Sequence, residues 1–191
     1  MGPPRGDDLA ELLDIVLGTG VRIGEALALR WQEIDLENAV PTALVAGTLV
    51  TVEGKVLRQD HPKTATGRRV VVLPTFVVDA LQRQRARDLP ADDGLVFPSA
   101  RGGARSPNNV RRQLRDARGV GLEWVTPHVL RKTTATFIVR AVGIDAAAAQ
   151  LGHSGTRVTA THYIHKAHAA PDLRVILDEF APGAHSVQDS A

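Results

Sequence analysis

The strongest constraint on the fold is a change in hydrophobic periodicity near residue 43. Before it, apolar residues recur at helical spacing from Leu9 to Val16 and from Ile23 to Trp31, with Gly18-Thr19-Gly20 between them. After it come three runs rich in β-branched residues, separated by glycine-containing turns, at 44–45, 49–52 and 70–73. We therefore predict a small three-stranded antiparallel sheet near the amino-terminal part of a mainly helical α+β fold.

Helices are predicted to form most of the chain beyond this sheet. Pro74 ends the third strand, and residues 76–89 have an apolar side and an arginine-rich side. Ser106-Pro107 and Thr126-Pro127 each place a capping hydroxyl before a proline at the first helical position, which predicts two further helix starts. Shorter helices are predicted at 145–151, 157–163 and 172–180.

Length and composition indicate a single domain outside the membrane. The 191 residues are enough for one well-buried domain, which we expect at 9–182, with residues 1–8 as a linker and residues 183–191 as a disordered tail. No apolar run approaches the roughly 20 residues that cross a bilayer. The chain has no cysteine, which excludes disulfides and thiolate sites and is compatible with the reducing cytoplasm.

Arginine is far more common than lysine, with 19 arginines and four lysines. A GC-rich coding sequence explains such a bias, but the distribution along the chain is more informative. Residues 101–118 contain six arginines and one acidic residue, Asp116. This charge favours DNA phosphate contacts without base readout by Arg111, Arg112 and Arg115, the alternative being an ordinary solvated helix face.

Two segments combine an arginine with a second ionisable group at helical spacing. In Thr19-Gly20-Val21-Arg22-Ile23-Gly24-Glu25, Arg22 begins a mainly apolar helix, where it either faces an anionic partner or pairs at the surface with Glu25. In Thr126-Pro127-His128-Val129-Leu130-Arg131, the histidine and arginine share a face near a helix amino terminus, which favours an anion. A phosphodiester suits such a pair, although His-x-x-Arg alone is a weak signal.

Two further segments lie near the carboxyl end. Leu151-Gly152-His153 is the first, and the second contains His162 and Tyr163, the only tyrosine of the chain. His162, His165 and His168 have a spacing that can suggest a metal site, but only two of them fit one helical face and no carboxylate accompanies them. No metal is therefore expected.

Taken in order, these four segments resemble the tyrosine recombinase and phage integrase family. In that family an arginine in T-G-x-R-x-x-E is followed by a lysine in a β-turn, by H-x-x-R, by L-G-H and by a late tyrosine. Every position is filled here, over nearly the whole chain from Leu9 to Phe180. The lysine corresponds to Lys63, which lies in the segment His61 to Arg69 before the third predicted strand.

The resemblance implies a catalytic set of six residues, Arg22, Lys63, His128, Arg131, His153 and Tyr163. The tyrosine attacks the scissile phosphorus and forms a 3′-phosphotyrosyl bond, the two arginines clamp the phosphate oxygens, and the lysine protonates the departing 5′ oxygen. His128 assists the tyrosine proton and His153 hydrogen-bonds the phosphate. Glu25 either orients Arg22 or has a surface role, and no cofactor is expected.

The same resemblance implies double-stranded DNA as the partner and self-association as a tetramer on DNA, for a bacterial or phage-encoded recombinase. The helix at 172–180 resembles the family's terminal helix, which docks on a neighbouring subunit. Family members also carry an amino-terminal domain that completes a clamp around DNA, and the residues before Leu9 are too few to form one, so weak DNA binding is expected. A type IB topoisomerase and a non-catalytic DNA-binding remnant of an integrase are the alternatives.

Overall fold

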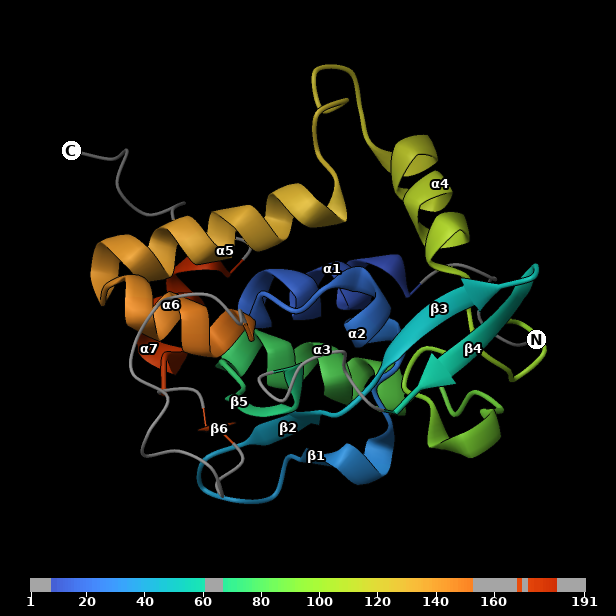
Figure 1. The fold of residues 1–191 in the computed structure, drawn as a ribbon, viewed down its shortest axis with the longest axis horizontal. Helices are drawn as coiled ribbons and strands as arrows, with labels where there is room; N and C mark the ends of the chain where they lie inside the picture. The colour runs from blue at the N-terminus through green and yellow to red at the C-terminus, as the bar shows by residue number, and fades with distance from the viewer. Residues whose placement is uncertain (1–7, 61–66, 153–167, 170–171, 182–191) are drawn as a thin grey trace.

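The computed structural model describes residues 8–60, 67–152, 168–169 and 172–181 (Figure 1). The helices in this part are α1 (Leu9–Thr19), α2 (Ile23–Leu27), α3 (Thr75–Arg85), α4 (Pro107–Ala117), α5 (Pro127–Ala141), α6 (Ile144–Leu151) and α7 (Arg174–Leu177). The strands are β1 (Ile34–Asp35), β2 (Thr42–Val45), β3 (Thr48–Val52), β4 (Lys55–Gln59), β5 (Arg69–Val72) and β6 (His168–Ala169). Short 3₁₀ turns lie at Trp31–Glu33, Asp92–Gly94 and Asp178–Phe180.

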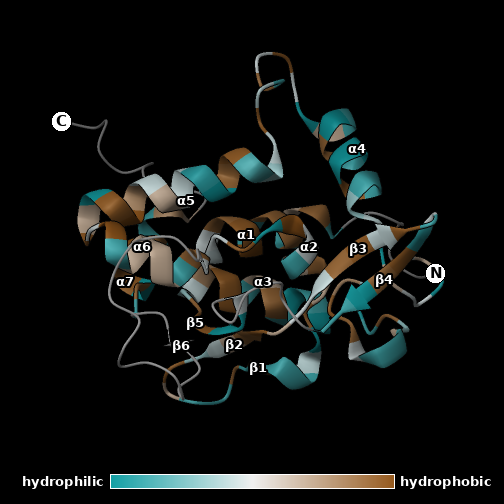
Figure 2. Ribbon diagram, viewed as in Figure 1, coloured by the Kyte–Doolittle hydropathy of each residue, from teal (hydrophilic) through white to brown (hydrophobic). Residues whose placement is uncertain are grey.

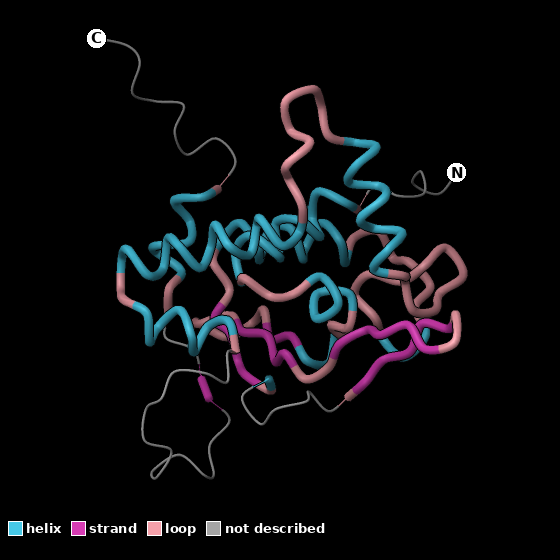
Figure 3. The backbone as a smooth tube through the Cα atoms, turned by 45° about the horizontal axis from the view of Figure 1, so that its top comes forward, coloured by secondary structure: helices cyan, strands magenta, loops and turns pink. Residues whose placement is uncertain are grey.

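Helix α1 is at the centre of the fold, and the mainly helical α+β class is confirmed. It packs against α3 on one side and α5 on the other, and Leu12, Ile15 and Val16 are fully buried or nearly so. Figure 2 shows α1 as mostly hydrophobic and α4 as mostly hydrophilic, so the two helices differ in how much of their surface meets the core. The strands run along one side of the helices (Figure 3).

The strands form two sheets, which corrects the prediction of a single three-stranded sheet. The first has the order β1-β2-β5-β6, with β2 antiparallel to β5 and β6 parallel to it. The second is a separate hairpin of β3 and β4. Only Ala46 and Gly47 separate β2 from β3, yet the two strands belong to different sheets because their partners lie in different parts of the chain.

Strand β4 escaped prediction because it lies on the surface. Its pattern is Lys-Val-Leu-Arg-Gln, and Leu57 is half exposed, so it lacks a β-branched apolar run. The turn before it is a better signal. Glu53 and Gly54 have φ angles of 48° and 77°, the left-handed pair that closes a two-residue hairpin.

Both helix starts predicted from a hydroxyl before a proline are confirmed, but the Ser106 side chain makes no capping hydrogen bond. Pro107 and Pro127 occupy first-turn positions of α4 and α5. The Thr126 side chain caps α5 by accepting a hydrogen bond from the backbone N–H of Val129 at 3.2 Å. Helix α3 ends at Arg85, four residues before the predicted end, and Asp88 beyond it has a φ of 45°. The predicted helix at 157–163 and tail at 183–191 lie outside the described residues.

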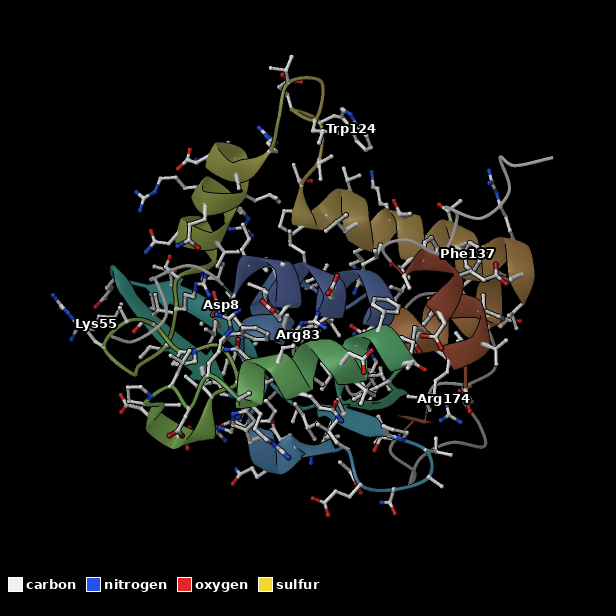
Figure 4. All side chains as sticks on the ribbon, turned by 180° about the vertical axis from the view of Figure 1, so that it is seen from behind. Asp8, Lys55, Arg83, Trp124, Phe137 and Arg174 are labelled. Carbon is white, nitrogen blue, oxygen red and sulfur yellow. The ribbon has the colours of Figure 1, made fainter. Side chains whose placement is uncertain are left out.

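The last helix, α7, packs on its own chain, and the expected docking on a neighbouring subunit stays a prediction. Leu173 and Leu177 are buried in a small second core with Ile138 of α5 and Ala147 of α6. The ring of Phe137, labelled in Figure 4, lies 4.2 Å from that of Phe180 in an edge-to-face arrangement. Part of the apolar face that was expected to bind a partner therefore closes this core, whereas Val175 is 83% exposed. In the part of the chain that the structure describes, no helix is long and apolar enough to cross a membrane.

Candidate active site

Three members of the predicted catalytic set, Arg22, His128 and Arg131, line one pocket. It has a volume of about 520 Å³ and lies between the start of α2, helix α4 and the amino end of α5. Its charged and titratable lining residues are Arg22, Arg111, Arg115, Arg118, Glu123, His128 and Arg131. Five of these seven residues are arginines, so the pocket attracts an anion.

The turn that follows α1 brings the first motif to the third. Gly20 ends α1 with a φ of 68°, the left-handed conformation that favours glycine. A Cβ built on Gly20 would come within 2.7 Å of a methyl carbon of Leu151, so a side chain at this position would push the end of α6 away. The close approach places the Gly20 carbonyl beside the Leu151 carbonyl, and both face α5.

Arg131 is bound to those two carbonyls. It lies one turn into α5, is only 5% exposed, and donates to the Gly20 oxygen at 2.5 Å and the Leu151 oxygen at 2.9 Å. Burial, with the nearby charges of Arg22 and Arg69, lowers the pKa of Arg131 to about 10, against the opposing effect of Glu25. The group is still protonated at neutral pH, and an anion in the pocket would offset the cost of its burial.

Glu25 is a buried carboxylate that contacts several arginines. It is 7% exposed and accepts hydrogen bonds from the Arg22 backbone N–H at 2.9 Å, from Arg22 Nη1 at 2.8 Å and from Arg69 Nη2 at 3.0 Å. Arg131 Nη1 lies 4.0 Å from Glu25 Oε2. Burial alone would raise the pKa of Glu25, but Arg69 and the bonds from Arg22 outweigh it and hold that pKa below its ordinary value of 4.5.

The sequence left two environments open for Arg22, an anionic ligand and a surface pair with Glu25, and the structure is compatible with both. Its side chain is 52% exposed and pairs with Glu25 three positions on, as a surface residue would. It also lines the pocket together with Arg131, from a segment more than a hundred residues away in the sequence. One guanidinium group is therefore oriented by a buried carboxylate while much of it stays accessible to a ligand.

His128 occupies the first turn of α5 and lines the same pocket. It is exposed, and its position in the first turn places it at the positive end of the helix dipole, which favours an anion. A histidine and a buried arginine three residues apart thus share the pocket, as their spacing predicted.

The arginines of residues 101–118 fall into groups with different environments. Arg105 is buried and pairs with Asp8 at 2.7 Å, so it has a structural position. Arg111 and Arg115 are exposed and line the pocket from α4, and we call them the α4 arginine pair. Arg112 is exposed but is not among the lining residues.

The loop between α4 and α5 forms one wall of the pocket and projects from the body of the molecule (Figure 1). Arg118 anchors its base by donating to the Val125 carbonyl at 2.8 Å. Trp124, labelled in Figure 4, is 64% exposed, and its Nε1 donates to the Gly121 carbonyl at 3.0 Å. The loop is therefore held by its own hydrogen bonds rather than by core packing.

Two residues that the sequence did not single out belong to the same network. Arg69 is fully buried, and Gln150 is 1% exposed, with its Nε2 donating to the Thr19 carbonyl at 2.9 Å. Strand alternation is the signal that could have found Arg69, because Arg69 and Val71 face inward while Arg68 is exposed. We call Glu25, Arg69 and Arg131 the buried network.

Three members of the predicted catalytic set, Lys63, His153 and Tyr163, lie outside the described residues, as do His162 and His165 of the histidine run. The ends of the segments that carry them are described. Gly67 and Arg69 follow the lysine segment, and Gly152 and His168 flank the segment with His153 and Tyr163.

Known proteins of one family are similar to this chain. The model of the phage integrase family matches residues 7–170. An integrase of Streptomyces ambofaciens is 31% identical over 173 residues, which cover 83% of this chain and 45% of that protein. Tyrosine recombinase XerC of Xanthomonas axonopodis pv. citri is 32% identical over 153 residues, covering 78% and 44%. The chain thus spans less than half the length of these relatives.

The fold comparison agrees with these sequence matches. The Tn1549 transposon integrase, solved in complex with circular intermediate DNA, has a TM-score of 0.62 and 25% identity, and the match covers 76% of this chain and 51% of that chain. The family model, the sequence relatives and the fold comparison all match integrases or tyrosine recombinases. This chain belongs to the phage integrase, or tyrosine recombinase, family.

Proposed function

We propose that this chain is the catalytic domain of a site-specific DNA recombinase, which cuts and rejoins double-stranded DNA through a 3′-phosphotyrosyl bond to Tyr163. The observation that carries the proposal is the convergence of Arg22, His128 and Arg131 on one pocket. These residues come from two segments that are far apart in the sequence, and both segments match the family's motifs. A pocket with this charge and a histidine suits a phosphodiester.

The reaction exchanges one phosphate ester for another. The Tyr163 oxygen attacks the scissile phosphorus, the bond from phosphorus to the 5′ oxygen breaks, and the DNA 3′ phosphate becomes attached to the tyrosine. The tyrosine loses a proton, with assistance from His128, and the departing 5′ oxygen gains one from Lys63. Rejoining is the reverse reaction with a 5′ hydroxyl of another strand, so no energy source is needed.

The arginines stabilise the charge that develops during this exchange. Negative charge grows on the two non-bridging oxygens in the five-coordinate transition state, and Arg22 and Arg131 would each bind one of them, with His153 as a further donor. Arg131 is held by two backbone carbonyls and Arg22 by Glu25, so little reorganisation is required when the phosphate arrives. The positive charge of these groups takes the place that a metal ion has in other nucleases.

The proposed substrate, double-stranded DNA, follows from similar proteins. The Tn1549 integrase was solved with DNA, and we extend double-stranded DNA as the substrate to this chain. Assembly as a tetramer on DNA is proposed for the whole protein.

Covalent capture tests the proposal directly. The chain is incubated with a pool of nicked duplexes of randomised sequence, and members that remain attached to protein in detergent are recovered, which gives one captured duplex for all later work. Tyr163→Phe should bind this duplex nearly as well as the wild type and form no adduct, because only the nucleophilic oxygen is removed. An adduct that survives in Tyr163→Phe would assign the nucleophile elsewhere. Relaxation of supercoiled DNA without exchange between two captured sites would instead indicate a topoisomerase.

A further inference from the structure

Arg69 has an unusual position for a charged residue. It is the first residue of β5, its exposure is 0%, and it is among the largest fully buried side chains of the described chain. An ionised group in such a place is stable only where its donors are well satisfied. The contacts of Arg69 are therefore the first thing to examine.

The guanidinium group binds three different segments. Its Nε donates to the Gln150 carbonyl at 2.7 Å, its Nη1 to the Gly67 carbonyl at 3.2 Å and its Nη2 to Glu25 Oε2 at 3.0 Å. Glu25 in turn binds Arg22. The planar fork of an arginine can satisfy three acceptors in fixed directions, whereas a lysine ammonium cannot reach all three.

The three acceptors lie at the borders of the segments that carry the proposed chemistry. Gly67 ends the segment that contains Lys63. Gln150 directly precedes Leu151, whose carbonyl accepts a hydrogen bond from Arg131, and the segment with His153 and Tyr163 begins two residues later. At the other end of that segment, β6 pairs with β5 so that His168 lies opposite Arg69 itself.

We propose that Arg69 is a positioning residue for the proposed strand-transfer reaction, acting through Glu25 and the carbonyls of Gln150 and Gly67 without touching DNA. It fixes the carboxylate that orients Arg22, and it holds the borders of the two segments from which the lysine, the second histidine and the nucleophile come. This inference rests on the proposed function.

A purely structural role of Arg69 would lower stability without changing the rate of adduct formation on bound DNA. The test therefore measures stability and this rate separately. The variant Arg69→Lys keeps the charge but loses the fork. The matched control is Arg87→Lys, which changes a largely buried arginine, 17% exposed, that pairs with Glu11 at 3.2 Å and belongs to none of the motif segments. For each variant we would measure the thermal midpoint, the affinity for the captured duplex and the rate of adduct formation with all protein bound to DNA.

We expect Arg69→Lys to bind the duplex with an affinity within a factor of about two of the wild type. Such a change corresponds to far less binding free energy than a tenfold change in affinity. Its adduct should form about 10- to 100-fold more slowly at saturating DNA, the range produced by misplacing reacting groups by up to about 1 Å. Arg87→Lys should lose comparable stability and keep the wild-type rate. A wild-type rate in folded, DNA-saturated Arg69→Lys would overturn the proposal.

A second variant and a second readout keep the test independent of folding and of the reaction. If Arg69→Lys does not fold, Glu25→Gln weakens the same contact from the other side, and a wild-type rate in that variant would overturn the proposal. If the wild type forms no adduct, the proposed function fails, and Arg69 is judged by the affinity of the pocket for inorganic phosphate. That affinity should fall severalfold in Arg69→Lys and stay unchanged in Arg87→Lys, and equal affinities would contradict the positioning role.

Discussion

The buried network and the α4 arginine pair hold their guanidinium groups in opposite ways, and Arg131 of the network lines the same pocket as the α4 pair. In the buried network, Arg69 and Arg131 are at most 5% exposed and their donors are bound to carbonyls or to Glu25. On α4, Arg111 and Arg115 are exposed, and Arg111 donates to Asn108 on its own helix. From the proposed function we therefore expect a division of labour, in which the buried guanidinium groups serve the transition state and the exposed ones serve DNA binding.

The largest effect is expected at Arg131. Arg131→Ala should slow adduct formation by about 100- to 1,000-fold even at saturating DNA, because it removes a preorganised donor from the phosphate. Arg131→Lys should remain severely defective, since an ammonium cannot bind both carbonyls and a phosphate oxygen. Arg140→Ala changes an exposed arginine at the far end of the same helix and is the control, with an expected wild-type rate. Rescue by lysine would mean that charge alone matters.

Lys63 separates proton donation from charge neutralisation. If it protonates the departing 5′ oxygen, Lys63→Ala should slow cleavage by about 100-fold or more on ordinary DNA. Sulfur at that bridging position is a better leaving group and needs little protonation, so the variant should recover most of its rate on this substrate. Arg131→Ala should not recover, and Lys55→Ala should resemble the wild type on both. An equal defect of Lys63→Ala on oxygen and sulfur would assign the lysine to binding or positioning.

Glu25 tests whether the buried network contributes to stability as well. Its pKa is lowered in the folded state, so its contribution to the free energy of unfolding is full above pH 4.5 and is lost as the pH falls through the folded-state pKa. Glu25→Gln should therefore lose about 1.5 to 3 kcal/mol at pH 7, the range for hydrogen bonds to charged groups. The difference from the wild type, followed by denaturant unfolding, should shrink at acidic pH. A difference that is constant with pH would assign it to packing.

The α4 arginine pair should contribute to the salt dependence of DNA affinity. Arg111→Ala and Arg115→Ala should each flatten the plot of log affinity against log salt by about 0.9 if the side chain contacts one phosphate. Arg112→Ala lies on the same helix outside the pocket lining and should change the slope less. Binding titrations at several salt concentrations measure this, and three equal effects would mean that DNA covers the whole basic face of α4.

The sequence predicted what depends on local signals and missed what depends on distant pairing. The helix starts at Ser106 and Thr126 were predictable because a proline in the first turn acts locally, and Thr126 also caps its helix. The division of the strands into two sheets was not, since β2 pairs with a strand more than twenty residues away. The α7 face was correctly read as apolar, but periodicity does not say whether it packs on its own chain or on another.

The candidate site divides in the same manner. Arg22, His128 and Arg131 could be found because short motifs carry them, and the structure brings all three to one pocket. Arg69 was not found, because its sequence neighbour Arg68 is equally basic and only the fold buries one of the two. Counting charge along the sequence also included Arg105 in the basic segment, whereas the fold buries it against Asp8, ninety-seven positions away.

The most direct test of the division of labour is a titration of adduct-formation rate against DNA concentration, with the double variant Arg111→Ala/Arg115→Ala beside Arg131→Ala. We expect the α4 double variant to need more captured duplex but to reach the wild-type rate at saturation, whereas Arg131→Ala should stay about 100-fold slower or worse at any concentration. A saturated rate that is equally low in both variants, or restored in both, would rule out this division of labour.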